Sequence, residues 1–401
     1  MASSSVRALR RGASACQAQA LDFLVRGLPA SRGVLDPYLD QRESSPGVRH
    51  AFNLATRGGT PLVVKTAGGL SAATGFIVTI FGSTGMLGRA VVNNLAKIGA
   101  QCMIPYRGLE DKPRHLKVMG DLGQIVPFVC NIRDEDAIRA AIAKSNVVIN
   151  LIGREYETRN YGFEEVNIDI AQRIARISKE HGGIVRYIHT SCVGADENSP
   201  SKQHRTKALG EEAVRQEFPE ATIMRPASMF GYHDKFLNRF ATKAKFWPNV
   251  PMFFDGKTRV QPVCVLDVAA AFLAAVKEKE GIHVGKVYEL GGPDVYTIHE
   301  LLLWMFEVLR EKPRIINIPL PLAEAVSRVR EFFFKRVPVP LPQLWPCYRH
   351  YIDSLKVDQV VSPDALTFEE LGIKPRPLGG LATEYLFYYR EGGPHMGQFR
   401  L

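Results

Sequence analysis

The stretch FIVTIFGSTGMLG at residues 76–88 predicts a nucleotide-binding strand–turn–helix unit. Residues 76–81 are apolar and rich in β-branched side chains, which is typical of a buried strand. Gly82, Gly85 and Gly88 follow at once, and apolar residues then recur at helical spacing. Such glycines permit a tight turn and a close backbone approach to a pyrophosphate, and the helix N-terminus adds unpaired N–H groups. An ordinary glycine-rich turn is the alternative, but the strand, the spacing and the helix together favour nucleotide binding.

The next expected strand, residues 101–106, carries the information on cofactor choice. It ends in Arg107, with no acidic residue that would bind the ribose 2′-hydroxyl of NAD. An arginine at this point accommodates the 2′-phosphate of NADP. Lys112 and Arg114 lie nearby in the sequence and belong equally well to a solvated basic loop. Arg107 therefore predicts NADP(H).

Further strands and helices alternate along the chain. Additional strands are expected at residues 125–129, 147–153, 185–191 and 222–226, with helices between them, for example at 168–180 and 207–217. This alternation predicts an α/β fold with a doubly wound parallel sheet, an NAD(P)-binding Rossmann fold, whose ligand lies at the carboxyl ends of the strands.

Several short motifs carry a resemblance to a known family. They are GSTGMLG at 82–88, VNIDIA at 166–171, HTSCVGA at 189–195, RPASMFG at 225–231, VLDVA at 265–269 and YELGGPDVYTIHEL at 288–301. Over residues 76–310 the chain resembles the extended, atypical short-chain dehydrogenases/reductases. Within that family it is similar to the NADPH-binding accessory subunits of mitochondrial respiratory complex I. The supporting pieces are MIPYRG at 103–108, KALGEEAVRQEFPEATIMRPASMFG at 207–231, and FLNRFA at 236–241.

The glycine fingerprint, the strand ends and the resemblance together predict one cofactor site. The residues expected in it are Gly82, Ser83, Thr84, Gly85, Met86, Leu87, Gly88, Arg107, Asn131, Ile132, Leu151, Ile152, Gly153, Ser191, Lys207 and Pro226. No metal site is expected, and the scattered cysteines predict neither a disulfide framework nor a zinc site.

The resemblance also implies a catalytic Tyr-x-x-x-Lys pair, and this chain lacks its tyrosine. In active relatives the tyrosine exchanges a proton with the substrate, the lysine binds the nicotinamide ribose, and a serine orients the substrate. Here Ser191 and Lys207 match, but Gln203 stands at the tyrosine position. A glutamine amide does not titrate near neutral pH, so it cannot exchange that proton. His204 is titratable, but it is turned by about 100° around a helix of 3.6 residues per turn.

The N-terminus predicts delivery to an organelle. Residues 1–21 contain three arginines and several serines, with no acid before Asp22 and no long apolar core. That pattern is typical of a mitochondrial transit peptide, although a disordered basic tail is the alternative. We expect residues 1–50 to be the transit peptide and N-terminal extension, and residues 51–75 to be a linker.

The C-terminal part predicts a docking extension. We divide the remaining chain into a nucleotide-binding domain with interleaved substrate-side segments, 76–300, and a smaller C-terminal α/β region, 301–401. Residues 323–335 predict a basic amphipathic helix, which suits a membrane surface, a partner protein or closure of the substrate side. The proline-rich segment 337–352 is expected to be neither a regular helix nor a central strand.

Together with the family resemblance, which implies the complex, these patterns predict a non-catalytic NADP(H)-binding accessory subunit of mitochondrial complex I, peripheral on the matrix side of the inner membrane. Its expected partners are the other subunits, with the membrane surface contacted through the basic helix. An active NADP-dependent reductase or isomerase is the alternative. The net charge of +10 also raises a nucleic-acid-binding member of the fold. Its basic residues are dispersed rather than interleaved with exposed aromatics, so no nucleic acid is expected as a partner.

Overall fold

The computed structural model describes residues 74–158, 160–278, 280–336 and 349–390, all within one compact unit of the chain. The predicted transit peptide, the linker before residue 74 and most of the proline-rich segment lie outside these residues. No helix among them is long and apolar enough to span a bilayer.

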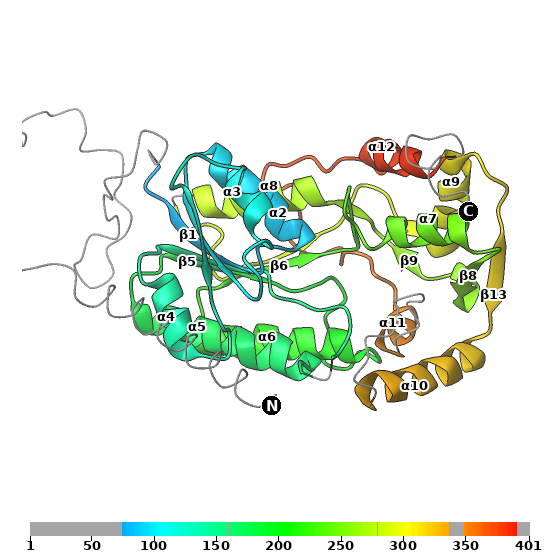
Figure 1. The fold of residues 1–401 in the computed structure, drawn as a ribbon, viewed down its shortest axis with the longest axis horizontal. Helices are drawn as coiled ribbons and strands as arrows, with labels where there is room; N and C mark the ends of the chain where they lie inside the picture. The colour runs from blue at the N-terminus through cyan, green and yellow to red at the C-terminus, as the bar shows by residue number, and fades with distance from the viewer. Residues whose placement is uncertain (1–73, 159, 279, 337–348, 391–401) are drawn as a thin grey trace, which may run out of the picture. The chain divides into compact units, whose positions relative to one another are not determined.

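Seven parallel strands form the central sheet (Figure 1). Their order across the sheet is β11-β6-β5-β4-β1-β2-β3. The strands are β1 (Ile77–Phe81), β2 (Gln101–Tyr106), β3 (Ile125–Val129), β4 (Val147–Asn150), β5 (Arg186–Thr190), β6 (Thr222–Pro226) and β11 (Val287–Leu290). Strand order reverses between β1 and β4, which is the topological switch point of a doubly wound fold. The predicted fold class is therefore confirmed, and β11 is a strand that the sequence did not predict.

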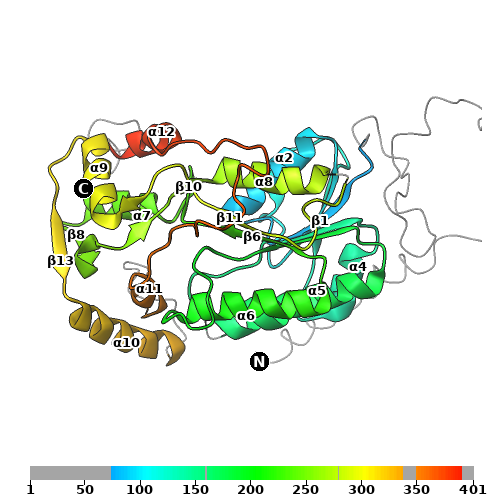
Figure 2. The same cartoon turned by 180° about the vertical axis from the view of Figure 1, so that it is seen from behind.

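Helices cover both faces of this sheet. One face carries α2 (Met86–Lys97), α3 (Arg114–Lys117) and α8 (Val265–Lys277), and the other carries α4 (Glu135–Ile142), α5 (Ile170–His181) and α6 (Lys202–Glu217) (Figures 1 and 2). A π-helical turn, Glu165–Asp169, leads into α5. Each face has its own apolar core, because the buried strands present side chains in both directions.

A third apolar core lies beyond the carboxyl edge of the sheet. Its elements are β7 (Met229–Phe230), α7 (Leu237–Phe246), β8 (Val250–Phe253), β9 (Arg259–Val260), β10 (Val263–Cys264), β12 (Tyr296–Thr297), α9 (Ile298–Leu309), β13 (Ile315–Ile318), α10 (Leu320–Arg336), α11 (Arg349–Ser354) and α12 (Leu381–Leu386). This core draws apolar residues from 230–264 and from 298–386, so segments far apart in sequence build it together.

A C-terminal strap, residues 357–378, runs from α11 past β11 and β10 to α12 (Figure 2). The amide of Glu289 in β11 donates to the Leu366 carbonyl at 2.8 Å, and the amide of Gln359 donates to the Arg259 carbonyl at 2.8 Å. Backbone pairing of this kind satisfies polar groups at the sheet edge. The strap therefore fastens the C-terminal part to the nucleotide-binding sheet.

One helix begins earlier than expected, and another forms where no regular helix was expected. Helix α6 begins at Lys202, five residues before the expected start at Lys207, so Gln203, His204 and Lys207 share one helix. In the proline-rich segment, the prediction of no regular helix was wrong for residues 349–352, which belong to α11. These residues follow the last proline of the segment, Pro346, so the ring constraint no longer applies to them.

Candidate functional site

A cleft of about 770 Å³ opens at the carboxyl ends of β1, β4, β5 and β6. A cleft at this edge of a doubly wound sheet is where such folds bind ligands. The predicted site residues that line it are Gly82, Thr84, Gly85, Met86, Leu87, Gly88, Leu151, Gly153, Ser191, Lys207 and Pro226. The structure thus brings together residues from four strand ends and from α6.

Two glycines of the loop, Gly82 and Gly88, have no room for a side chain. Gly82 has φ +84°, and a Cβ placed there would lie 2.9 Å from the Leu151 carbonyl carbon. A Cβ on Gly88 would lie 2.5 Å from the Ser83 carbonyl oxygen, which is closer than real Cβ atoms come. Gly85 precedes α2 with extended backbone and no capping side chain, so the first amides of α2 keep their N–H groups for a ligand.

Three of the predicted residues, Ser83, Ile132 and Ile152, are packed beneath the cleft and do not line it. Ser83 is fully buried. Ile132 and Ile152 pack against the core on the α4–α6 face, and the Ile152 amide donates to Asn150 Oδ1 at 3.1 Å. Their side chains therefore shape the strand ends without lining the cleft.

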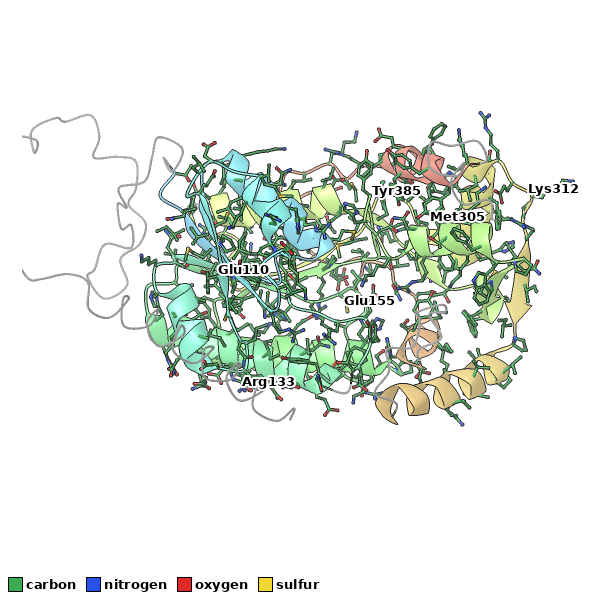
Figure 3. All side chains as sticks on the ribbon, in the orientation of Figure 1. Glu110, Arg133, Glu155, Met305, Lys312 and Tyr385 are labelled. Carbon is green, nitrogen blue, oxygen red and sulfur yellow. The ribbon has the colours of Figure 1, made fainter. Side chains whose placement is uncertain are left out.

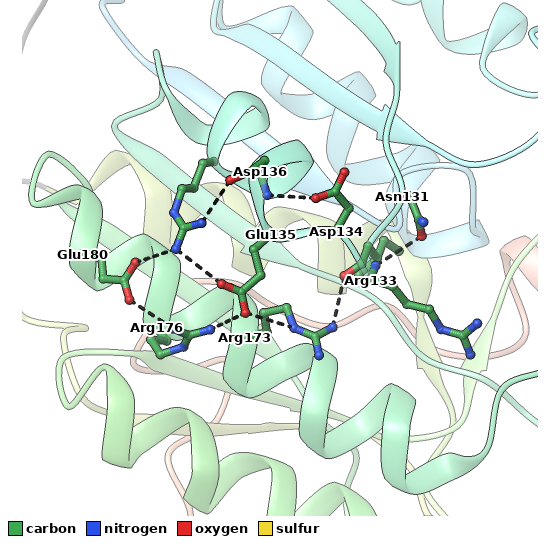
Figure 4. Close-up of polar contacts among 10 residues, drawn as sticks. Asn131, Arg133, Asp134, Glu135, Asp136, Arg173, Arg176 and Glu180 are labelled. Atoms are coloured by element: carbon green, nitrogen blue, oxygen red, sulfur yellow. Dashed lines mark hydrogen bonds and ion pairs between the residues drawn. The ribbon is translucent and has the colours of Figure 1, made fainter.

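Asn131 also lies outside the cleft lining, in the turn between β3 and α4. Its Oδ1 accepts from the Arg133 amide at 3.2 Å, and Asp134 caps α4 by accepting from the Asp136 amide (Figure 4). Beyond this turn, Glu135 pairs with Arg139 and Arg176, which ties α4 to α5. The exposed Asn131 side chain organises the turn.

Arg107 is exposed at the end of β2 and is not part of the cleft lining. Its guanidinium carbon lies 4.5 Å from the centre of the Tyr161 ring. Arg133 and Arg154 approach the same ring, at 4.3 and 5.3 Å. Three guanidinium groups thus gather around one aromatic ring, in the range of cation–π contacts.

Lys207 is buried, so the surface-lysine interpretation of this residue is wrong. Its Nζ donates to the Thr190 carbonyl at 2.9 Å. A Cβ placed on Gly153 would be 3.6 Å from the same nitrogen. Burial lowers the pKa of Lys207, because removal from water disfavours the charged form. The ammonium group lies at the floor of the cleft between β4 and β5.

Two hydroxyls beside Lys207 have no hydrogen-bond partner among the described residues. They are Thr190 Oγ1 and Ser191 Oγ, on side chains that are 8% and 5% exposed. Buried polar groups are nearly always satisfied, so these atoms are free to bond a ligand. A nicotinamide ribose and carboxamide would supply such partners, and the glycine loop suits a pyrophosphate. The residues present therefore fit a dinucleotide.

Gln203 and His204 both line the cleft, so the expected rotation around the helix does not remove His204 from it. His204 is 5% exposed, and its Nδ1 has no partner among the described residues. Burial lowers the pKa of His204, and the nearby His350 lowers it further. A neutral imidazole at pH 7 follows from this.

Other residues of the cleft were missed by sequence reasoning. They are Arg89, Arg154, Glu155, Tyr156, Thr190, Cys192, Val193, His233, Lys235, Phe236, Arg239, His350, Tyr351, Ser354 and Gln359, among others. Several of them fell in motifs that carried the family resemblance: Thr190, Cys192 and Val193 lie in HTSCVGA, and Phe236 and Arg239 lie in FLNRFA. No local sequence pattern identifies the cleft residues from α11 and the strap, because these segments follow all seven strands of the sheet in the sequence.

The fold and cleft define a Rossmann-fold protein of the class that binds nicotinamide nucleotides. The sequence model of the NAD dependent epimerase/dehydratase family matches residues 78–291. The chain is 50% identical to the mitochondrial NADH dehydrogenase [ubiquinone] 1 alpha subcomplex subunit 9 of Arabidopsis thaliana, over 87% of each chain. It is 38% identical to the subunit of that name from Rattus norvegicus, over 92% of this chain and 93% of the relative. The chain belongs to the epimerase/dehydratase family and, within it, to the family of these mitochondrial alpha subcomplex subunits.

Solved structures share the fold at low sequence identity. An NADPH-dependent quinone oxidoreductase from Escherichia coli, complexed with NADPH, superposes with a TM-score of 0.60 at 18% identity, covering 78% of this chain and all of that one. A UDP-glucuronic acid 4-epimerase from Bacillus cereus gives a TM-score of 0.53 at 16% identity, covering 61% and 86%. These similarities confirm the fold class.

Proposed function

We propose that this chain is a non-catalytic NADP(H)-binding accessory subunit of mitochondrial NADH:ubiquinone oxidoreductase, in which the nucleotide stabilises the folded subunit. One observation carries the non-catalytic part: Gln203 lines the cleft beside Ser191 and Lys207, where the resemblance implies a tyrosine. Bound NADPH supplies a hydride, and its transfer to a carbonyl needs a proton as well. Gln203 cannot deliver that proton, because its amide does not titrate near pH 7.

The other predicted site residues, in the cleft and at its edge, are proposed to bind the dinucleotide. The loop at residues 82–88 and the N-terminus of α2 would hold the pyrophosphate. Lys207 and Ser191 would contact the nicotinamide ribose and carboxamide, and Arg107 would contact the 2′-phosphate of NADP. Residues 76–300 would thus serve binding, and residues 301–401 docking.

A nucleotide that is bound but not turned over still stabilises the folded protein. A ligand that binds only the folded state stabilises it by mass action, by about 2.7 kcal/mol when its concentration is 100 times the dissociation constant. A marginally stable domain gains a large fraction of its total stability in this way. The proposed role of the nucleotide is therefore structural.

The names of the relatives support the proposed association with mitochondrial NADH dehydrogenase and the mitochondrial location. Subunits of this family from plants, mammals and fungi are named as mitochondrial NADH dehydrogenase or NADH-ubiquinone oxidoreductase subunits. We propose the same association, on the matrix side of the inner membrane. Helix α10 would contact the membrane surface, because Leu322, Val326 and Val329 on it are 56%, 49% and 59% exposed.

Native-gel fractionation of detergent-solubilised mitochondrial membranes tests the assembly. The chain should co-migrate with an NADH-oxidising complex, and migration as a free monomer would contradict the proposal. Recombinant protein tests the rest: NADPH should bind, shown by its fluorescence, and should not be oxidised with small carbonyl compounds. Carbonyl-dependent NADPH oxidation that is lost in Lys207→Ala would overturn the non-catalytic role.

An active reductase is a second candidate, because the buried, neutral His204 lines the same cleft. In that case His204 would exchange the proton in place of the missing tyrosine. The two candidates differ in one measurement. NADPH oxidation that is abolished by His204→Gln but retained by Gln203→Ala would favour the reductase.

A further inference from the structure

The loop after β4 presents one aromatic ring, that of Tyr161, to arginines from three strand ends. Arg107 follows β2, Arg133 lies in the turn after β3, and Arg154 follows β4. The guanidinium carbons of the three lie 4.5, 4.3 and 5.3 Å from the centre of the Tyr161 ring. Arg154 also lines the cleft, so the group of four residues adjoins it. The face of an aromatic ring carries negative potential and attracts cations, which makes Tyr161 a common neighbour of three positive side chains.

Two of the three arginines are held by groups other than the ring. Arg133, labelled in Figure 3, donates from Nε to Glu165 Oε1 at 2.6 Å and from Nη2 to Glu165 Oε2 at 2.9 Å. Arg154 donates from Nη1 to Thr158 Oγ1 at 2.9 Å. These hydrogen bonds fix the two guanidinium groups whether or not the ring is present.

Arg107 depends on the ring alone. Its side chain is exposed, and among the described residues its guanidinium makes neither a hydrogen bond nor an ion pair, only the contact with Tyr161. An exposed arginine that is not held samples many rotamers, and ordering it on a ligand costs conformational entropy. The cation–π contact orders the side chain before the ligand arrives, and such preorganisation raises affinity.

Tyr161 is anchored independently of Arg107. The Thr158 amide donates to the Tyr161 carbonyl at 3.0 Å, and the Tyr161 amide donates to the Thr158 carbonyl at 3.3 Å. Its side chain packs against the apolar core on the α4–α6 face, as do those of Ile132 and Ile152. The ring therefore keeps its place without Arg107, whereas Arg107 loses its one contact without the ring.

The charges around the ring favour a phosphate. Glu165 neutralises Arg133, but neither Arg107 nor Arg154 is paired with a carboxylate among the described residues. A phosphate monoester carries close to two negative charges at pH 7, which match these two cations. NADPH differs from NADH by one such group, the 2′-phosphate.

We propose that Tyr161 is a positioning residue for cofactor choice: its ring holds Arg107 in place for the 2′-phosphate and so sets the preference for NADPH over NADH. The proposal rests on the proposed function, in which Arg107 contacts that phosphate. It assigns the choice of cofactor to the loop after β4 as well as to the end of β2.

Fluorescence titration of the full chain with NADPH and with NADH tests the proposal. In Tyr161→Leu we expect NADPH affinity to fall about fivefold, or about 1 kcal/mol, the size of one exposed cation–π contact. NADH affinity should change less than about twofold, because NADH has no 2′-phosphate for Arg107 to contact. Tyr161→Phe keeps the ring and should restore most of the preference. Tyr296→Leu is the matched control, since Tyr296 is also half-buried but lies outside the cleft lining, and it should bind both nucleotides like the wild type.

A double-mutant cycle tests whether Tyr161 acts through Arg107. If it does, the double variant Arg107→Ala/Tyr161→Leu binds NADPH about fivefold more weakly than the wild type, like either single variant. Independent contributions would multiply to a loss of about 25-fold, and that result would overturn the proposal.

The remaining outcomes separate this inference from the proposed function. Tyr161→Met is a second variant without a ring, and it should show the same selective loss even if Tyr161→Leu does not fold. Equal losses of NADPH and NADH affinity in the ring-free variants would show that Tyr161 only supports the loop, and would overturn the proposal, as would unchanged NADPH affinity. If the wild type itself does not bind NADPH, it is the proposed function that fails.

Discussion

The two ends of the cleft are built in opposite ways. The glycine-loop end comes from one contiguous stretch, residues 82–88, and works through backbone groups. The other end, which we call the far chamber, is lined by three segments, at residues 154–156, 235–239 and 350–354, and presents charged and aromatic side chains. A site formed by backbone groups tolerates few changes of sequence. A site formed by side chains acquires specificity for a different ligand through a few substitutions.

This contrast is consistent with the proposed non-catalytic function. The nucleotide end needs only glycines and a helix N-terminus, and both are present. In the proposed function, proton transfer is absent because Gln203 stands on α6 where the family resemblance implies a tyrosine. On that proposal, nucleotide binding and catalysis separate at a single position.

The largest effect is expected at the glycine-loop end, from Gly88→Ala. The added Cβ would lie 2.5 Å from the Ser83 carbonyl oxygen, so the loop must move away from the start of α2. We expect NADPH affinity to fall at least 100-fold, or about 2.7 kcal/mol, in a fluorescence titration. Gly379→Ala is the matched control, because nothing lies within 4 Å of its Cβ, and it should bind normally. Near-normal NADPH binding by Gly88→Ala would show that the backbone of the loop shifts without loss of nucleotide affinity.

The second-largest effect is expected from protonation of His189 in the central sheet, which joins the two ends of the cleft. His189 on β5 is buried against Asn150, and burial lowers the pKa of His189 to about 3. Its ordinary pKa is about 6.5, so the unfolded chain binds the proton first as the pH falls. Stability contributed by the neutral side chain is present above pH 6.5 and decreases below it, by about 2 kcal/mol between pH 7 and pH 5.

Urea unfolding of the wild type and His189→Gln at the two pH values measures this effect. The variant should lose less stability on acidification by about that amount, because the other histidines titrate equally in both proteins. Parallel pH profiles would show that His189 is not held neutral in the folded state.

The same contrast decides how much of the molecule the sequence predicts. The glycine loop and six of the sheet strands follow from local patterns, because apolar runs and glycine spacing lie within a few residues of each other. Strand β11 escaped prediction because its sequence, VYEL, is short and contains a glutamate. That glutamate is buried in an ion pair of 3.0 Å with Arg225, and Arg225 also pairs with Glu211 of α6. A partner contributed by another strand is invisible in a local pattern.

The far chamber illustrates the limit more strongly. Lys235 and Glu155 are 80 residues apart, and His350 is 195 residues from the carbonyl that it contacts. No periodicity or motif relates such positions. Only the folded chain, with the strap returning along the sheet, brings them to one cleft.

Between the two ends, Lys207→Met should separate binding from stability. The buried ammonium is disfavoured by desolvation, which is why its pKa is lowered. Methionine fills similar space without charge, so we expect the free energy of unfolding in urea to be unchanged or raised. Affinity for NADPH should nevertheless fall about tenfold, or about 1.4 kcal/mol, through loss of the ribose contact. A parallel loss of stability and affinity would instead identify Lys207 as a structural residue.

The smallest effect is expected from Arg107→Ala, which tests whether side chains at the edge of the cleft set the cofactor choice. Arg107 is exposed and rests on Tyr161, so its removal leaves the glycine loop untouched. We expect NADPH affinity to fall about fivefold, or about 1 kcal/mol, and NADH affinity to stay the same, because only NADPH carries the 2′-phosphate. Arg205→Ala is the control for overall charge, since Arg205 lies outside the cleft lining on α6. Equal losses for both nucleotides in Arg107→Ala would mean that the arginine positions the strand end, and that selection of the phosphate falls to Arg133 or Arg154 on the same ring.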